Sequence, residues 1–468
     1  SLDLIKKLKK HVEKNGDLKS RNFFEGIYPL FSAYKLPEIK IDDSSYFSRS
    51  LFMKIKSLIK FLKLMSELIL SILISRETQS KKVGILFLNY SKRHLNEAYY
   101  DLIPHLKDSR KIYVGQRDEC YDEGVFEYIN IKKFISLNLF ISIIKEFALT
   151  FYSKKSLLKT FYKKNDDHLF KVLKYEIILL YNFQHIVYEH LSKKIIKIFK
   201  PSLIVTADDN DPRCRSMIIE AKKNNIKSLL IQQGLSSEFS VDYSFFLGDH
   251  IAAINKISKK HLIDFGVNIN KITVTGRPSF SRLKNNHNKL KRNILFTSQP
   301  SSGGYLFKNS DERKLYLKTL YGGMKGLENV LLKVKPHPDE EVTIHEKIKK
   351  KMDFKNLDVY ASTHDTNKLL NDSDFLISFG STTIIEGVIS KSIVMIFDPF
   401  ERLKELDYFK GNVPIFNDIK LITSEITKLI KNEDKYLKYL NNQNEKLNSY
   451  VPMINSAESV SKLIKNLN

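Results

Sequence analysis

Cysteine and tryptophan are the scarcest residues, since the 468-residue sequence has only Cys120 and Cys214 and no tryptophan. Two cysteines are too few for a disulfide framework or for a zinc site built on cysteine. So little cysteine is typical of proteins of the reducing cytosol. We therefore expect a cytoplasmic protein stabilised by its apolar core, and we expect no metal and no other cofactor.

Several motifs of known chemistry are missing as well. The sequence has no G-x-x-x-x-G-K-[ST], no G-x-G-x-x-G after Asn89 and no G-x-S-x-G. These absences argue against a P-loop NTPase, an NAD-binding enzyme and a serine hydrolase of the nucleophile-elbow type. No uninterrupted apolar run is long enough to span a membrane, and residues 1–20 lack the apolar segment of a secretory signal.

Acidic residues are few compared with basic ones: 77 lysines and arginines against 53 aspartates and glutamates give a net charge of +24. Such an excess predicts an anionic partner, which can be nucleic acid, a phospholipid surface or a phosphorylated substrate. The lysines are spread along the whole chain. We therefore expect no nucleic-acid partner.

Residues 51–76 combine a helical apolar period with a basic side. One interpretation is a helix packed on the protein surface, and the other is a helix that lies on a membrane surface, attracted to anionic headgroups by its lysines. The apolar positions are Leu51, Ile55, Leu58, Leu62, Met65, Ile69 and Ile72, and the lysines are Lys54, Lys56, Lys60 and Lys63.

From residue 81 onward, apolar runs of strand length alternate with helical stretches. This alternation predicts an α/β fold with mostly parallel sheets. The runs are 83–90, 111–115, 201–207, 227–234, 250–254, 271–276, 293–300, 329–338, 357–362, 374–381 and 392–399.

A polar linker at 281–292 divides the alternation of strands and helices into two halves. Each half is predicted to be a Rossmann-type, doubly wound domain, and the two domains face a cleft. Ligands of such domains bind at the carboxyl ends of the strands. The predicted organisation is a helical N-terminal extension (1–80), a first Rossmann-like domain with a helical insert (81–280), the linker, a second Rossmann-like domain (293–450) and a C-terminal helix (451–468).

The sharpest local motif is Lys335-Pro336-His337-Pro338, which ends a strongly apolar strand. Two prolines fix the backbone around the histidine and stop the strand there. A histidine held at the carboxyl edge of a sheet can bind a phosphate oxygen or protonate a leaving phosphate, and Lys335 adds positive charge. The alternative is a proline turn with a bystander histidine.

A second motif, Ser378-Phe379-Gly380-Ser381-Thr382-Thr383, carries a strand through a glycine and three hydroxyls into a helix. A helix N-terminus with hydroxyl side chains favours a phosphate. Glu386, one turn further on, is placed to accept a hydrogen bond from a ribose hydroxyl, and Gln299, near the end of the predicted strand 293–300, is a further candidate for the same site. Ordinary N-capping by serine or threonine is the alternative.

The pairing of KPHP with SFGSTT…E resembles the nucleotide-binding half of GT-B glycosyltransferases of bacterial surface polysaccharide synthesis. It is most similar to those that use CMP-activated sugars, namely sialyl-, polysialyl- and capsule Kdo transferases. Residues 248–282 are also similar to capsule-biosynthesis and UDP-GlcNAc 2-epimerase-like proteins.

The resemblance implies a metal-independent glycosyltransferase whose second domain binds a nucleotide-sugar donor, with a CMP-sugar favoured, and whose first domain binds a glycan or glycolipid acceptor. The helix at 51–76, if it lies on a membrane surface, would attach such an enzyme to the inner face of the membrane. The donor-binding set would be Lys335, His337, Pro338, Ser381, Thr382, Thr383, Glu386 and Gln299.

One departure from the pattern affects catalysis. Related capsule enzymes and CDP-glycerol phosphotransferases often carry Gln-His-Gly after a strand of the first domain, where this chain has Gln232-Gln233-Gly234. Glutamine is neither an acid nor a base, so Gln233 is expected only to orient a substrate.

The catalytic base is therefore expected among the carboxylates after strand 201–207, which are Asp208, Asp209 and Asp211, with Glu238 in reserve. Crowded carboxylates at the edge of a cleft raise one another's pKa, which suits a general base. Three arginines are candidates for binding a substrate carboxylate through paired hydrogen bonds: Arg213, Arg215 and Arg277.

The sequence thus predicts transfer of a CMP-activated acidic sugar to a surface glycan or glycolipid, with Asp208 or Asp209 as base and His337 at the leaving nucleotide. Two alternatives on the same fold stay open, a CDP-alditol phosphotransferase and a UDP-sugar epimerase. A further alternative is a membrane-associated binding protein without catalytic activity.

Overall fold

The structure is a computed structural model. It describes residues 2–33, 43–75, 82–91, 95–107, 109–115, 127–165, 176–236, 240–283, 290–299, 307, 309–338, 340–403, 413–447 and 455–468.

The first of two parallel sheets follows the strand order β3-β2-β1-β4-β5-β6-β7. Runs such as Ile-Leu-Phe-Leu at β1 form central strands because both faces of such a sheet are covered by helices. Ile85 pairs with Lys111 on one side and with Leu203 on the other, so the chain crosses over between neighbouring strands. The strands are β1 (Ile85–Leu88), β2 (Lys111–Gly115), β3 (Tyr128–Asn130), β4 (Leu203–Thr206), β5 (Lys227–Ile231), β6 (His250–Ala253) and β7 (Ile272–Val274).

Helices and short helical turns cover this sheet. Helix α8 begins at Pro212, and the side chain of Asp211 caps it by accepting a hydrogen bond from the N–H of Arg213. One of the helical stretches between the strands contains a π turn, η1, and a 3-10 turn, η2, the second around Pro104. The helical elements are η1 (Leu95–Tyr99), η2 (Tyr100–His105), η4 (Ile131–Phe134), α5 (Leu137–Asn165), η5 (Glu176–Tyr181), α7 (Asn182–Phe199), α8 (Pro212–Lys223), η6 (Val241–Phe245), α9 (Lys256–Asp264), η7 (Ile269–Lys271) and η8 (Pro278–Arg282).

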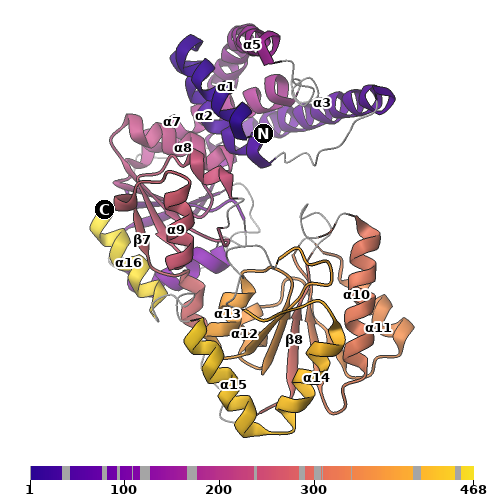
Figure 1. Cartoon of the computed structure of the whole chain (residues 1–468). Coiled ribbons are helices and arrows are strands. Elements are labelled where there is room, and N and C mark those ends of the chain that lie inside the picture. Colours follow the sequence, from indigo (N-terminus) through magenta and orange to yellow (C-terminus); the bar gives the residue numbers. More distant parts are fainter. Residues whose placement is uncertain are drawn as a thin grey trace.

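Three N-terminal helices, α1 (Leu2–Asn15), α2 (Leu18–Ala33) and α3 (Asp43–Ile74), form the predicted helical extension. Figure 1 shows them beside α5, α7 and α8, on the side of the first sheet away from the second one. Helix α2 is joined to the first sheet's layer, because Arg215 Nε donates to the carbonyl of Glu25 and the rings of Tyr28 and Phe245 lie 5.2 Å apart.

Helix α3 divides its apolar residues between the core and the exposed surface. Leu64 and Leu68 are buried in the core of the first half. Much of the predicted stripe lies outside, with Ile55 50%, Leu62 56% and Ile69 50% exposed. None of the helices in the described residues combines the length and apolar composition that a membrane crossing requires.

The second sheet is also entirely parallel, in the order β10-β9-β8-β11-β12-β13. The strands are β8 (Asn293–Thr297), β9 (Leu331–Lys335), β10 (Leu357–Val359), β11 (Phe375–Ser378), β12 (Ile393–Phe397) and β13 (Ile415–Phe416). The helices are α10 (Ser310–Lys325), α11 (Val342–Met352), α12 (Thr366–Leu370), α13 (Thr383–Ile389), α14 (Ile419–Ile430) and α15 (Glu433–Lys446).

The last helix, α16 (Ser456–Leu467), returns to the first half of the molecule (Figure 1). Ala457, Val460 and Ile464 are buried in the same cluster as Ile85 and Phe87 of β1. The predicted α/β class with two doubly wound parallel sheets is confirmed, and the chain end crosses from the second half onto the first.

Candidate active site

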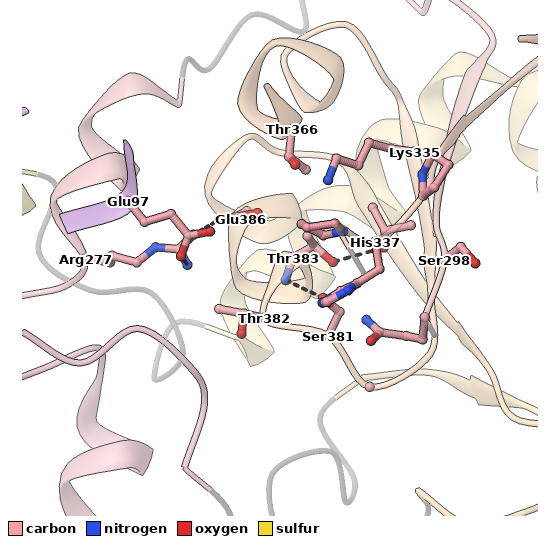
Figure 2. Close-up of a pocket in the computed structure, with 15 residues that line it drawn as sticks. Glu97, Arg277, Ser298, Lys335, His337, Thr366, Ser381, Thr382, Thr383 and Glu386 are labelled. Atoms are coloured by element: carbon pink, nitrogen blue, oxygen red, sulfur yellow. Dashed lines mark hydrogen bonds and ion pairs between the residues drawn. The ribbon is translucent and has the colours of Figure 1, made fainter. Parts of the chain in front are cut away.

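A cavity of about 210 Å³ lies where β8, β9 and β11 end at the same edge of the second sheet. Three strand ends supply most of its wall, and Glu97 and Arg277 enter from the first half (Figure 2). The lining residues are Glu97, Arg277, Thr297, Ser298, Gln299, Lys335, Pro336, His337, Pro338, Thr366, Gly380, Ser381, Thr382, Thr383 and Glu386. The cavity therefore brings together every residue predicted to bind the donor.

The KPHP motif forms one wall as the sequence pattern predicts. Lys335 is the last residue of β9 and is 8% exposed, and His337 is half-buried in the turn that follows. The His337 N–H donates to Glu340 Oε2 at 3.0 Å, which fixes this turn. A lysine and an imidazole, both of which can donate hydrogen bonds to an anion, thus line one cavity.

The SFGSTT segment forms an adjoining part of the wall. Gly380 has a φ of +71°, a conformation that costs a residue with a side chain more than glycine. Thr297 Oγ1 and Thr383 Oγ1 are 3.0 Å apart, and Ser381 Oγ accepts the N–H of Thr383 at 3.3 Å. Helix α13 has only seven residues. An anion in this cavity would therefore be bound by the hydroxyls and the cationic side chains rather than by a helix dipole.

Glu386, predicted to accept from a ribose hydroxyl, is 4% exposed and is paired with Arg277. Arg277 also donates to Glu97 Oε2 at 2.8 Å and to the carbonyl of Gln233 at 3.3 Å. Figure 2 shows Glu97, Arg277 and Glu386 together on one side of the cavity, with His337 and Ser381 on the other. Arg277 therefore connects the two halves of the molecule through protein carboxylates.

Two of the three aspartates predicted as base, Asp208 and Asp209, lie at a second cavity, of about 290 Å³, at the carboxyl ends of β4 and β5. The third, Asp211, instead caps α8 and pairs with Arg213. Its lining includes Asp208, Asp209 and Gln233, and it shares no lining residue with the first cavity. Asp209 is 3% exposed and lies 3.9 Å from Arg215 Nη1. Asp208 is half-buried, and its Oδ1 accepts the N–H of Asn210 at 2.8 Å.

The arginines after β4 have structural partners. Arg213 pairs with Asp211 and lies 4.3 Å over the Tyr90 ring. Arg215 is fully buried and donates to the carbonyls of Asp209 and Phe245. Neither guanidinium lines the first cavity. Glu238, the reserve base, is outside the described residues.

Sequence reasoning missed Glu97, Thr366 and Glu340. Glu97 and Thr366 line the cavity from η1 and α12, and no strand end in the sequence pointed to them. Glu340 lies behind the cavity wall, three residues after His337. This short spacing is the one feature of the sequence that could have identified Glu340. Among the described residues, no group of three or more His, Cys, Asp or Glu side chains is arranged to hold a metal ion.

Two parallel doubly wound sheets with a cavity at the carboxyl edge of the second define the GT-B fold. No protein-family model matches this chain, and neither does any curated protein. A solved variant of the wall teichoic acid polymerase TagF, soaked with CDPG, is similar in structure with a TM-score of 0.51 and 14% identity, over 91% of this chain and 99% of that one. A protein from Listeria monocytogenes assigned as a UDP-N-acetylglucosamine 2-epimerase is similar with a TM-score of 0.52 and 9% identity, over 82% of this chain and 96% of that one.

Proposed function

We propose that this chain is a transferase that binds the phosphate of a nucleotide-activated donor in the first cavity and moves the activated group to a cell-surface glycan or glycolipid. One observation carries the proposal: Lys335, His337 and the hydroxyls of Ser381 and Thr382 line one cavity from two strand ends. Cationic and hydroxyl donors gathered at the carboxyl edge of a parallel sheet suit a phosphate.

Catalysis in this scheme is electrostatic. The lysine and the hydroxyls stabilise the negative charge that develops on the leaving nucleotide, and His337 donates a hydrogen bond or a proton to its phosphate. The side chains of the protein supply all of these groups, so the proposal contains no metal ion and no cofactor.

The acceptor is proposed to bind in the second cavity, with Asp208 as the base that deprotonates its hydroxyl. Asp209 is the weaker candidate, because it is buried beside Arg215. Among the residues that the structure describes, no lysine, arginine or histidine lines this cavity, and its polar side chains are carboxylates, amides and hydroxyls. Such a lining suits a neutral, hydroxyl-rich ligand such as a glycan. The contact between Arg277 and the Gln233 carbonyl connects the two cavities.

Two donors fit the proposal. A CMP-activated acidic sugar follows from the motif resemblance, although the arginines expected at its carboxylate, Arg213 and Arg277, both pair with carboxylates of the protein. A CDP-linked alditol is the second candidate, favoured by the similarity of fold to TagF along 91% of this chain.

We further propose that α3 attaches the protein to an anionic membrane surface beside a lipid-linked acceptor. Ile55, Ile59 and Leu62 are at least half exposed, and Lys56 and Lys60 are exposed on the same helix. Exposed apolar residues with neighbouring lysines are typical of helices that lie on membranes.

A thermal-shift series with CMP, CDP, UMP, UDP and GDP tests the proposed function, because a ligand that binds only the folded state raises its stability. A shift selective for CMP supports the acidic-sugar donor, and a shift selective for CDP supports the alditol donor. A UDP-only shift favours an epimerase or a hexosyltransferase. No shift with any of them contradicts the nucleotide site and leaves a binding protein without catalytic activity.

A further inference from the structure

A buried carboxylate lies directly behind the wall that carries His337. Glu340 is 7% exposed and does not line the cavity. Its Oε2 accepts the His337 N–H at 3.0 Å, and its own N–H donates to the His337 carbonyl at 2.9 Å. These two hydrogen bonds connect His337 and Glu340 in both directions and so stabilise the backbone at His337.

The other oxygen of the same carboxylate binds the neighbouring strand end. Ser298 Oγ donates to Glu340 Oε1 at 2.8 Å, and Arg313 forms an ion pair with the same oxygen. Arg313 Nε also donates to the carbonyl of Gln299 at 3.0 Å. Glu340 and Arg313 together therefore join the segment after β8 to the turn after β9, and both segments line the cavity.

A histidine and a tyrosine support this carboxylate from the interior. His345 is fully buried, and its Nε2 lies 3.1 Å from Glu340 Oε1 while its Nδ1 lies 2.6 Å from the hydroxyl of Tyr321. Burial, assisted by the charge of Arg313, lowers the pKa of His345 to about 4, so the ring is neutral near neutral pH. An ionised carboxylate only accepts, so Nε2 carries the proton and the Tyr321 hydroxyl donates to Nδ1.

We propose that Glu340 is a positioning residue for the donor-phosphate site: it sets the place of His337 and of Ser298–Gln299 relative to each other without touching the ligand. This inference rests on the proposed function for the nature of the ligand. Four donors converge on one buried carboxylate, and each of them belongs to the cavity wall or to the layer directly behind it. The arrangement is the one expected of a support for a binding site, whose polar groups must be held in place before the ligand arrives.

The variant Glu340→Gln tests the inference because it keeps the size of the side chain. The amide nitrogen of glutamine cannot accept a hydrogen bond, but it must take one of the two oxygen positions, where a donor faces it. Either the N–H of His337 or the hydroxyl of Ser298 therefore loses its acceptor. The matched control is Asp374→Asn. Asp374 is a fully buried carboxylate in the same half that accepts the N–H groups of Lys291 and Asn293, at the amino end of β8 and β11. That end of the sheet is opposite to the cavity.

Two measurements are made on the full chain, below the unfolding temperature of every variant. The first is the dissociation constant of the tightest-binding nucleotide of the series above. We expect Glu340→Gln to raise it about 10- to 100-fold, the usual cost of losing buried hydrogen bonds to a charged group, and Asp374→Asn to leave it within about twofold. The second is amide hydrogen exchange, in which peptides covering 293–299 and 333–346 should exchange faster in Glu340→Gln than in Asp374→Asn.

The outcomes separate this inference from the proposed function. If the wild-type chain binds no nucleotide, the proposed function is contradicted, while the exchange experiment still tests the positioning role. If Glu340→Gln binds nucleotide like the wild type, or if its two wall segments exchange like those of Asp374→Asn, Glu340 is not a positioning residue. A loss of binding in both variants also overturns the inference, because it would then reflect general destabilisation.

Discussion

His337 lies in a turn fixed by a proline on each side and by hydrogen bonds in both directions to Glu340. Its imidazole shares the cavity with Lys335 and Ser381, so its contribution to turnover should be that of a positioned acid or hydrogen-bond donor.

His337→Ala is expected to lower turnover about 10²- to 10⁴-fold with the accepted donor, while the unfolding midpoint stays close to that of the wild type. Steady-state kinetics with that donor measure the effect. His105→Ala is the matched control, because His105 is exposed on η2. Near-wild-type turnover in His337→Ala would remove the histidine from the reaction.

Lys154 provides a pH test at the same scale. It is 2% exposed, donates to Asn182 Oδ1 at 2.6 Å, and lies 4.5 Å over the Phe23 ring. Burial lowers the pKa of Lys154 to about 8 from 10.5. Between pH 8 and pH 10.5 the unfolded chain binds the proton of this lysine more tightly than the folded chain does. The lysine therefore makes the free energy of unfolding rise with pH.

Lys154→Met should abolish that rise. The quantity to follow is the free energy of unfolding of the wild type minus that of the variant. This difference is expected to increase between pH 8 and pH 10.5, by at most about 3 kcal/mol. Urea unfolding of both proteins across this pH range measures the difference. Both chains contain the same tyrosines, so the contribution of tyrosine ionisation to the two free energies cancels in the difference. A difference that is flat or falls with pH would contradict the buried charge.

At the residue scale, the sequence predicted the cavity residues that follow strands but not their partners. Lys335, His337 and Ser381 were predictable because strand ends in parallel sheets meet at one edge. The pairing of Glu386 with Arg277 joins residues 109 positions apart, and local sequence contains no sign of it. For the same reason Arg213 and Arg215 looked available for a substrate, although their partners are protein groups.

Among the elements, α3 exposes a continuous apolar face. Ile55, Ile59, Leu62, Ile69 and Leu73 recur at steps of three, four or seven residues and are between 50% and 80% exposed. A membrane surface would cover this face, and nearby lysines add about 1 kcal/mol each at an anionic surface. Deleting the helix is a poor test, because Leu64 and Leu68 belong to the core.

The triple variant Ile55→Glu/Ile59→Glu/Leu62→Glu keeps the buried side of α3 and should therefore stay folded. The wild type is expected to sediment with vesicles that contain anionic lipid, less so as salt rises, and the triple variant is expected to remain in the supernatant. Leu421→Glu, at a 53% exposed position on α14, should behave like the wild type. Equal sedimentation of wild type and triple variant would contradict a membrane role for α3.

Long apolar strands were predictable, whereas short or irregular elements were not. Strands β2, β4 and β5 lie within predicted runs, because continuous apolar residues of that length fit a sheet covered on both faces. Strands β3 and β13 have three and two residues and contain too little pattern to be recognised. The sequence pattern did not separate the buried side of α3, with Leu64 and Leu68, from its exposed apolar side, because apolar residues surround the helix.

For the molecule as a whole, ionic contacts connect the two halves. Arg277 lies between Glu97 of the first half and Glu386 of the second, and its side chain is 3% exposed. Arg282 lies 3.0 Å from Asp101 and 3.5 Å from Asp365. The sequence predicted two Rossmann-type units and a linker, but the contacts across them and the return of α16 depend on tertiary structure.

Arg277→Met should destabilise the protein by about 3–5 kcal/mol, because it leaves the buried Glu386 carboxylate without its partner. Arg277→Met/Glu386→Gln removes that charge and should recover a large part of the loss. Chemical unfolding of the wild type, both single variants and the double variant gives the coupling between the two residues. Additive losses, without recovery in the double variant, would contradict the pairing.

The most direct test of the central claim is a crystal structure of the full chain with the tightest-binding nucleotide. We expect its phosphate in the cavity at the carboxyl ends of β8, β9 and β11, with oxygens at hydrogen-bond distance, about 2.7–3.2 Å, from His337 and from the Ser381 or Thr382 hydroxyl. A nucleotide bound instead at Asp208 and Gln233, or elsewhere outside this cavity, would contradict the account.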